Sequence, residues 1–306
     1  MPRLTDSSVD PAQAPDWVER PERSNTLALR FMVWVAMALG RPVARLLLYP
    51  ICAYFLAFSP RARSASRQYL GKVLGRSARL SDSFRHYHSF ASVLLDRFFL
   101  LHDQISRFDV RLHGLELIEE ATARGEGCVL LGAHLGSFEI TRSAGRMHGR
   151  KICMLMYEDN ARKVGAVLRA INPDLHMEVI ALGRLDAMLK VEAALARGEV
   201  VGMLADRTLN DADTVRCPFL GQPARFPTGP MRIALMLKRP VLLLFGLYRG
   251  GNRYEIHVER FADPGEARGR ERAAAIDRLL RRYAERLEHY CRLAPYNWFN
   301  FYDFWR

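Results

Sequence analysis

A histidine and a glutamate five positions apart are the first residues whose types and spacing suggest chemistry. His134 follows an apolar run at residues 128–133 that is typical of a buried strand, and Glu139 precedes a helical pattern at residues 140–148. Ligands of open α/β sheets bind in the crevice at the carboxyl ends of the strands. A histidine there, oriented by a nearby carboxylate, could take a proton from a hydroxyl group. The spacing alone is uninformative, because nine histidines and 33 acidic residues in 306 positions yield about one such pair by chance.

The elements that must position His134 alternate between strand-like and helix-like patterns. Short apolar runs predict strands, and a 3.6-residue period predicts helices. We expect strands at residues 108–112, 128–133, 151–157, 177–182, 200–205, 215–220, 240–248 and 254–261, and helices at 81–102, 115–124, 140–148, 161–171, 186–197, 231–238 and 267–293. This alternation predicts an α/β fold in which a mixed sheet is flanked by helices.

Such a sheet would bring three further segments to the edge where His134 lies. They are residues 157–160 with Arg169 on the following helix, the pair at 206–207, and the Gly- and Pro-rich block at 219–230. Transfer of an acyl group needs a base for the hydroxyl proton and donors for the tetrahedral oxyanion. His134 with Glu139 suits the first need, and backbone amides at a turn or helix start, or an arginine, suit the second.

The N-terminal part of the chain changes abruptly from polar to apolar. Residues 1–26 are rich in Pro, Ser, Asp and Glu, and we expect a mobile leader. Residues 27–58 are expected to form a hydrophobic membrane anchor, although Gly40–Pro42 and Pro50 interrupt it. Neither half reaches the roughly 20 apolar residues of a spanning helix, so a tilted span, an in-plane anchor and a hairpin stay open, with a buried hairpin as the soluble alternative. Residues 59–306 are expected to be the catalytic domain, beginning with a basic, helix-prone link at 59–79.

Charge and composition narrow the classes of partner. The net charge of +12 attracts nucleic acid, anionic lipid or an acidic protein. A nucleic-acid binder is disfavoured because the aromatic residues lie in apolar runs rather than among the arginines. The arginine-rich helix at 267–293 has either a solvated face or a docking face for an acidic partner. Seven aromatic residues between 296 and 306 form either a core cap or a membrane-interface belt.

Metal and cofactor chemistry is not expected. The five cysteines are odd in number and widely spaced, and none belongs to a cluster with zinc-site spacing. Cys128 and Cys153 lie in apolar runs and are expected to be buried, reduced thiols. His86 and His88 are two positions apart on a predicted helix, so their side chains diverge.

Several motifs together resemble a known family. Residues 132–139 (GAHLGSFE) resemble the H-x4-D/E motif of the lysophospholipid acyltransferase superfamily, and the final Glu is similar to that of the bacterial lipid A lauroyl/myristoyl acyltransferases. Residues 198–207 (GEVVGMLADR) resemble that family's GEVVGLLPDQ, and residues 218–221 with 227–230 resemble its PFFG and TGP blocks. The order and spacing of these motifs, and the apolar N-terminal segment, also agree.

The resemblance implies an acyltransferase that moves a fatty acyl group from acyl-acyl-carrier-protein to a lipid hydroxyl, without a cofactor, at the cytoplasmic face of the bacterial inner membrane. It implies His134 as general base and Glu139 as its orienting partner. Expected substrate-binding residues are Arg169, Asp206, Arg207, Gly221, Thr228, Gly229 and Pro230. The acidic carrier protein would suit the basic surface.

The chain departs from the family pattern at three places. Ser137 and Phe138 replace the family's Asn and Trp, and an Asp-Arg pair stands where Asp-Gln or Asp-His is usual. Residues 226–230 lack the Glu and Arg of the FPEGTR motif of glycerol-phosphate enzymes, which disfavours a lysophosphatidate acceptor. The resemblance implies a lipid A precursor as acceptor. The aromatic C-terminal tail also resembles members associated with ornithine-type or aryl-polyene pigment lipids, so these acceptors stay open. The alternative to an enzyme is a non-catalytic membrane adaptor that docks carrier proteins.

Overall fold

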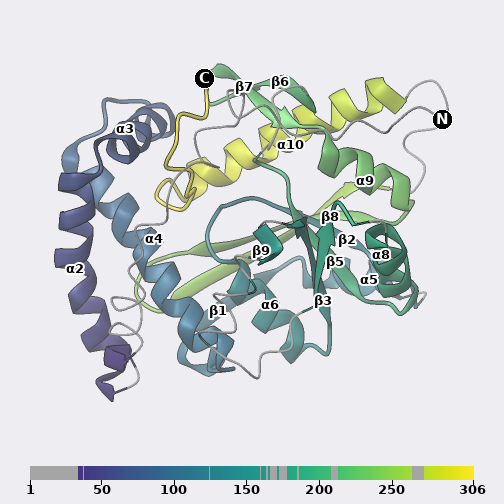
Figure 1. Ribbon diagram of the computed structural model, residues 1–306, viewed down its shortest axis with the longest axis horizontal. Helices are drawn as coiled ribbons and strands as arrows, with labels where there is room; N and C mark the ends of the chain where they lie inside the picture. Colours follow the sequence, from purple (N-terminus) through teal and green to yellow (C-terminus); the bar gives the residue numbers. More distant parts are fainter. Residues whose placement is uncertain are drawn as a thin grey trace, which may run out of the picture.

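The computed structural model places helices on both faces of one central sheet (Figure 1). The structure describes residues 34–36, 38–123, 125–158, 160–162, 165, 171, 178–184, 186–207, 213–263 and 272–306. The strands are β1 (Asp109–His113), β2 (Val129–Gly132), β3 (Ile152–Tyr157), β4 (Val179–Leu182), β5 (Val200–Leu204), β6 (Thr214–Phe219), β7 (Gln222–Pro227), β8 (Val241–Tyr248) and β9 (Arg253–Ala262). The helices are α2 (Gly40–Phe58), α3 (Pro60–Leu74), α4 (Leu80–Leu101), η2 (Ile105–Arg107), α5 (Leu115–Thr122), α6 (Phe138–Met147), α8 (Ala187–Ala196), α9 (Gly229–Leu237) and α10 (Arg272–Leu293).

The central sheet has seven strands in the order β1-β9-β8-β2-β5-β3-β4. All neighbouring pairs are parallel except β8 and β9, which are antiparallel, so the sheet is mixed as predicted. β2 lies between β8 and β5, and both of its faces are covered. This explains why the strand before His134 is apolar at every position rather than alternating.

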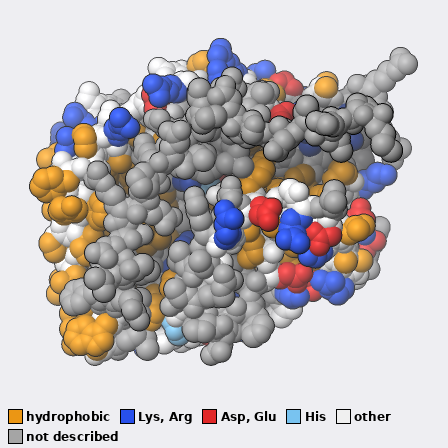
Figure 2. Space-filling model, in the orientation of Figure 1, with side chains coloured by type: hydrophobic (Ala, Val, Ile, Leu, Met, Phe, Trp, Pro, Cys, Tyr) orange, Lys and Arg blue, Asp and Glu red, His pale blue; other side chains and the backbone are white. Residues whose placement is uncertain are grey.

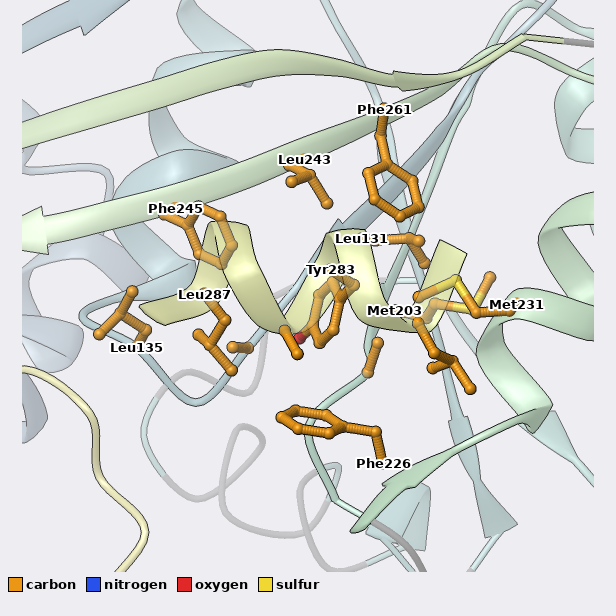
Figure 3. Close-up of a cluster of buried hydrophobic side chains, with 14 of the residues drawn as sticks. Leu131, Leu135, Met203, Phe226, Met231, Leu243, Phe245, Phe261, Tyr283 and Leu287 are labelled. Carbon is orange, nitrogen blue, oxygen red and sulfur yellow. The ribbon is translucent and has the colours of Figure 1, made fainter. Parts of the chain in front are cut away.

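Alternate side chains of the strands feed two hydrophobic cores. Leu131, Met203 and Phe245 point to the core shared with α3, α8, α9 and α10, where Tyr283 and Leu287 of α10 pack against them (Figure 3). Leu130 and neighbouring positions of the other strands point to the core shared with α2, α4, α5 and α6. The period-2 alternation of strands therefore divides one apolar sequence run between two layers.

Most expected elements are confirmed to within a few residues, with two qualifications. Residues 219–230 were expected as a Gly- and Pro-rich block at the sheet edge, but Gln222–Pro227 is a strand, because β6 and β7 pair as an antiparallel hairpin of their own. The expected helix at 161–171 lies mostly outside the described residues. The described residues of that stretch (161, 162, 165 and 171) are helical.

Helix α2, in the N-terminal apolar segment, has two unlike faces. Helix α2 is 19 residues long with a mean hydropathy of 1.3, which is long and apolar enough to cross a membrane. Its buried stripe, four residues apart at each step, faces α4 (Ala44, Leu48, Cys52 and Leu56). Arg41 also forms a bidentate ion pair with the buried Asp96 of α4, at 2.7 and 2.8 Å. One side of α2 is thus packed on the protein, and the expected leader at 1–26 lies outside the described residues.

The aromatic C-terminal tail packs against the body of the protein as a cap. Trp298, Phe299 and Phe304 are buried, and the Trp298 ring lies 5.0 Å from Tyr69 and 5.2 Å from Phe219 between ring centroids. Of the two expectations for this tail, the core cap is therefore confirmed. All five cysteines are buried free thiols, as expected for Cys128 and Cys153.

Candidate active site

The register of two neighbouring parallel strands brings His134 beside Asp206. Gly132 of β2 pairs with Leu204 of β5. His134 lies two positions after Gly132, and Asp206 lies two positions after Leu204. Because both strands run in the same direction, the two residues leave the sheet together at its carboxyl edge. The side chain of His134 keeps 29% of its surface exposed, whereas Asp206 is fully buried. The structure therefore brings these two expected site residues together at the carboxyl edge, with the buried Asp206 behind the partly exposed His134 ring.

The Asp206 carboxylate holds His134 by both its ring and its backbone. His134 Nδ1 lies 2.8 Å from Asp206 Oδ1, and the His134 backbone N–H donates to both carboxylate oxygens at 3.1 Å. Trp298 Nε1 and Asn300 Nδ2 each donate to Oδ2 at 3.0 Å. Since the carboxylate can only accept, Nδ1 carries the proton and the lone pair remains on Nε2. Asp206 was expected to bind substrate; in this structure it is fully buried and contacts the His134 ring.

The C-terminal segment completes this site from more than 150 residues away. Phe299 N donates to His134 O at 2.8 Å, and Gly136 N donates to Asn297 O at the same distance. Gly136 has φ +72°, and a Cβ there would lie 2.0 Å from Gly246 O, so only glycine fits this loop. The loop from His134 to the start of α6 is thereby fixed between the C-terminal segment and β8.

A buried histidine supports the C-terminal segment from behind. His86 Nε2 donates to Trp298 O at 2.8 Å, and Ser66 Oγ lies 3.0 Å from His86 Nδ1. Burial lowers the pKa of His86 to about 4, so the ring is neutral at physiological pH. His88 instead stacks near Tyr49, with 4.8 Å between ring centroids, so the two histidines diverge as expected.

Glu139 faces arginines rather than the His134 ring. It lies in the first turn of α6, and its Oε1 is 2.7 Å from Arg97 Nε of α4. Arg142, one turn further along α6, is 3% exposed and interacts electrostatically with Glu139. Among the described residues, Arg142 Nε and Nη2 have no hydrogen-bond partner and no hydrogen bond joins Glu139 to His134. Glu139 was expected to orient His134; in this structure Asp206, not Glu139, contacts His134 Nδ1.

The electrostatic environment keeps the His134 ring neutral. Burial and the positive charge of Arg207 lower the pKa of His134, and Arg97 adds to this effect, while Asp206 opposes it. Burial alone would raise the pKa of Asp206, but its contacts with His134 and the charge of Arg207 hold it below its ordinary value. Arg207 is itself fixed by Asn300 Oδ1 at 2.7 Å and Phe299 O at 3.0 Å. A neutral imidazole with an ionised partner has the protonation state of a general base.

The remaining expected substrate-binding residues lie on other elements. Gly221 lies at the β6–β7 turn, and Thr228 precedes α9 with its backbone N–H bonded to Asp213 O at 2.9 Å. Gly229 and Pro230 begin α9. Within the described ranges no hydrogen bond joins any of these four residues to His134. Arg169 lies outside the described residues.

Three residues of this site were missed by the sequence analysis. Arg97, Trp298 and Asn300 lie on a long amphipathic helix and in an aromatic tail, where periodicity and composition indicate only packing. The order of the strands and the path of the tail, which no local pattern encodes, bring them to His134.

A small cavity lies behind the His134 loop. It has a volume of about 20 Å³ and is lined mainly by apolar residues and glycines, including Ala133, Phe138, Met154 and Gly202. This is room for about one water molecule. A fatty acyl chain would enter here only if side chains moved.

Two groups of side chains elsewhere have donor atoms close enough for a metal ion. They are His113, Glu255 and His257 on β1 and β9, and Cys153, Glu178 and Glu199 around β3. In both groups the carboxylates already form ion pairs. Glu255 pairs with Arg249, and both Glu178 and Glu199 pair with Lys151. Neither group includes His134, and we assign neither a role in its chemistry.

Comparisons with known proteins place the chain in a family. The family of bacterial lipid A biosynthesis acyltransferases matches residues 18–306. Among solved structures, the chain is similar to the crystal structure of the 1-acyl-sn-glycerophosphate (LPA) acyltransferase PlsC from Thermotoga maritima. The two are 17% identical, with 79% of this chain and 97% of that chain covered and a TM-score of 0.36. No curated protein matched the chain. Because the family match spans nearly the whole sequence, the chain belongs to the bacterial lipid A biosynthesis acyltransferase family.

Proposed function

We propose that this acyltransferase moves a fatty acyl group from acyl-acyl-carrier-protein to a hydroxyl of a lipid A precursor-like acceptor, with His134 as the general base. The observation that carries the proposal is the hydrogen bond between His134 Nδ1 and the buried Asp206, at 2.8 Å. It leaves the lone pair on Nε2, the ring nitrogen that can take a proton from an incoming hydroxyl.

The reaction begins when Nε2 accepts the proton of the acceptor hydroxyl as its oxygen attacks the thioester carbonyl. A tetrahedral oxyanion forms and then collapses to an ester as the C–S bond breaks, and the departing carrier thiolate takes the proton from His134 Nε2. Asp206 stabilises the transient imidazolium, because the ionised carboxylate already contacts its Nδ1–H.

The negative charge of the oxyanion needs nearby positive charge. Arg97 and Arg207 both lower the pKa of His134 through their positive charges. Arg207 also follows Asp206 in the chain. It donates to the carbonyl oxygen of Phe299, the residue whose N–H donates to His134 O. We assign both arginines to oxyanion stabilisation, a role in which fixed donors in a partly dry site are most effective. In this proposal Glu139 holds Arg97 in place rather than orienting the base.

Membrane association is proposed to occur through α2. Its outward side chains are large and apolar, with Leu46 66% exposed and Phe58 62% exposed. An exposed apolar helix face of this kind suits a lipid environment. The enzyme would then meet its lipid acceptor and the soluble carrier protein at the cytoplasmic face of the bacterial inner membrane.

The test is transfer of labelled acyl groups from acyl-carrier-protein to lipid extracts by purified His134→Ala and a matched variant, His148→Ala. His148 is exposed at the end of α6. We expect His134→Ala to lose about 10²–10⁴-fold in rate, the usual contribution of a positioned base, and His148→Ala to match the wild type. Wild-type rates for His134→Ala would refute the assignment. Carrier binding without turnover by the wild-type protein on any lipid extract would instead support the adaptor alternative.

A further inference from the structure

A groove beside α3 collects positive charge immediately after the apolar helix. Residues 59–81 contain six basic residues and no acidic one: Arg61, Arg63, Arg67, Lys72, Arg76 and Arg79. Four of them, Arg63, Arg67, Lys72 and Arg76, line a groove of about 870 Å³ together with Ser64 and Gln68. None of the residues that line the groove, all of them described, is acidic. The groove therefore suits an anion, and its hydroxyl and amide groups can add hydrogen bonds.

The cations differ in how far they are already committed to the protein. Arg76 forms an ion pair with Asp82 at 2.7 Å, so its charge is largely balanced. Arg63 Nη1 donates to the carbonyl oxygens of Leu56 and Ala57, at 2.7 and 3.2 Å, which leaves its charge uncancelled. Arg67 is exposed, and Lys72 lies 4.9 Å above the Trp305 ring.

The groove begins where the apolar face of α2 ends. Only Ser59 separates the last residue of α2 from Pro60, which is both the first residue of α3 and part of the groove. Tyr49, Tyr54 and Phe58 on α2 are each more than half exposed. Figure 2 shows hydrophobic side chains gathered along the left edge of the molecule, where Figure 1 places α2, with Lys and Arg side chains above them near α3. Arg63 binds the end of α2 and so fixes the two surfaces relative to each other.

We propose that this groove binds the phosphate of an anionic phospholipid while the exposed face of α2 lies among the acyl chains. A guanidinium is well matched to phosphate oxygens, and a run of basic residues beside a membrane helix binds anionic headgroups. An acidic protein would account for the charge, but only a lipid also accounts for the adjoining apolar face. The inference rests on the proposed membrane association of α2, and it adds a defined headgroup site on the cytoplasmic side.

The test is flotation of the full-length protein with vesicles of phosphatidylcholine alone or of phosphatidylcholine with phosphatidylglycerol. The variant is Arg67→Gln with Lys72→Gln. The matched control is Arg216→Gln with Arg278→Gln, which removes the same charge from exposed positions on β6 and α10. Each basic residue near an anionic membrane contributes about 1 kcal/mol, or about fivefold in affinity. We expect about a 25-fold loss on anionic vesicles for the α3 variant, less than about twofold for the control, and no change on neutral vesicles.

The outcomes separate the groove from the anchor. Weak flotation of the wild-type protein on neutral vesicles would argue against membrane association by α2, while a preference for anionic vesicles that depends on Arg67 and Lys72 would still support the groove. Equal losses in the α3 variant and the control would overturn the groove, since general charge would then explain the binding. So would unchanged vesicle binding with a selective loss of affinity for acyl-carrier-protein, which would make the groove a protein-docking site. Equal thermal melting of both variants and the wild type checks their folding.

Discussion

Replacing Asp206 with asparagine tests most directly how the base is held. The carboxylate accepts from His134 Nδ1, Trp298 Nε1 and Asn300 Nδ2 as well as from the His134 backbone. An asparagine has one oxygen and one NH₂ group in the same space. If its oxygen stays with Trp298 and Asn300, its NH₂ group faces His134 Nδ1, which must then become an acceptor.

That change would place the ring proton on Nε2, the nitrogen that has to accept the hydroxyl proton. The rate constant should therefore fall by about 10²–10⁴-fold, the range that a positioned base contributes. Loss of a buried charge-assisted contact should also cost about 1–3 kcal/mol of folding free energy. Because Asp206 raises the pKa of His134, its removal should move the acid limb of the residual kcat/KM profile to lower pH.

The assay compares acyl transfer and urea unfolding for Asp206→Asn, Glu139→Gln and Asp96→Asn. Asp96 is another fully buried carboxylate, bound by Arg41 and Tyr254, and should lose stability with little loss of rate per folded molecule. Glu139→Gln should lose less than Asp206→Asn, because it acts through Arg97. Near-wild-type rates for Asp206→Asn, together with a 10³-fold loss for Glu139→Gln (the middle of that range), would refute the reasoning and restore Glu139 as the orienting residue.

Three further perturbations test other parts of the site. Arg97→Met should lower kcat by about 10²–10³-fold and should also cost about 1–3 kcal/mol of unfolding free energy, because the largely buried Glu139 loses this partner; an unchanged kcat per folded molecule would exclude Arg97 from charge stabilisation. Trp298→Phe removes one of the donors to Asp206 and part of a fully buried ring, and should cost about 2–4 kcal/mol of stability with a smaller loss of rate than Asp206→Asn, measured by urea unfolding and single-turnover transfer. The unfolded pKa of His86 is near 6.5 and the folded one about 4, so the unfolded state binds the proton first and stability falls as pH drops through that window. The loss should reach about 3 kcal/mol, and His86→Asn, which cannot titrate, should show a correspondingly weaker pH dependence in urea unfolding.

The layered fold could be read from local patterns because they report burial residue by residue. The continuous apolar runs before His134 and Asp206 predicted strands covered on both faces, and both are central strands of the sheet. The amphipathic period of residues 81–102 likewise predicted α4 almost to its ends. The strand at Gln222–Pro227 was not predicted, because the glycines and prolines of residues 219–230 indicate a turn rather than a strand.

The sequence by itself determined that His134 stands at a strand end with a carboxylate nearby in the chain, since strand and helix starts are set by local periodicity. Tertiary structure decided which carboxylate contacts the His134 ring. β5 is the neighbour of β2, which brings Asp206 from 72 residues away, and α4 draws Glu139 toward Arg97. Strand order and the path of the C-terminal tail depend on packing between layers, and side chains such as Trp298 carry no local mark of their partners. A periodicity that encodes which face is buried does not encode what lies against that face.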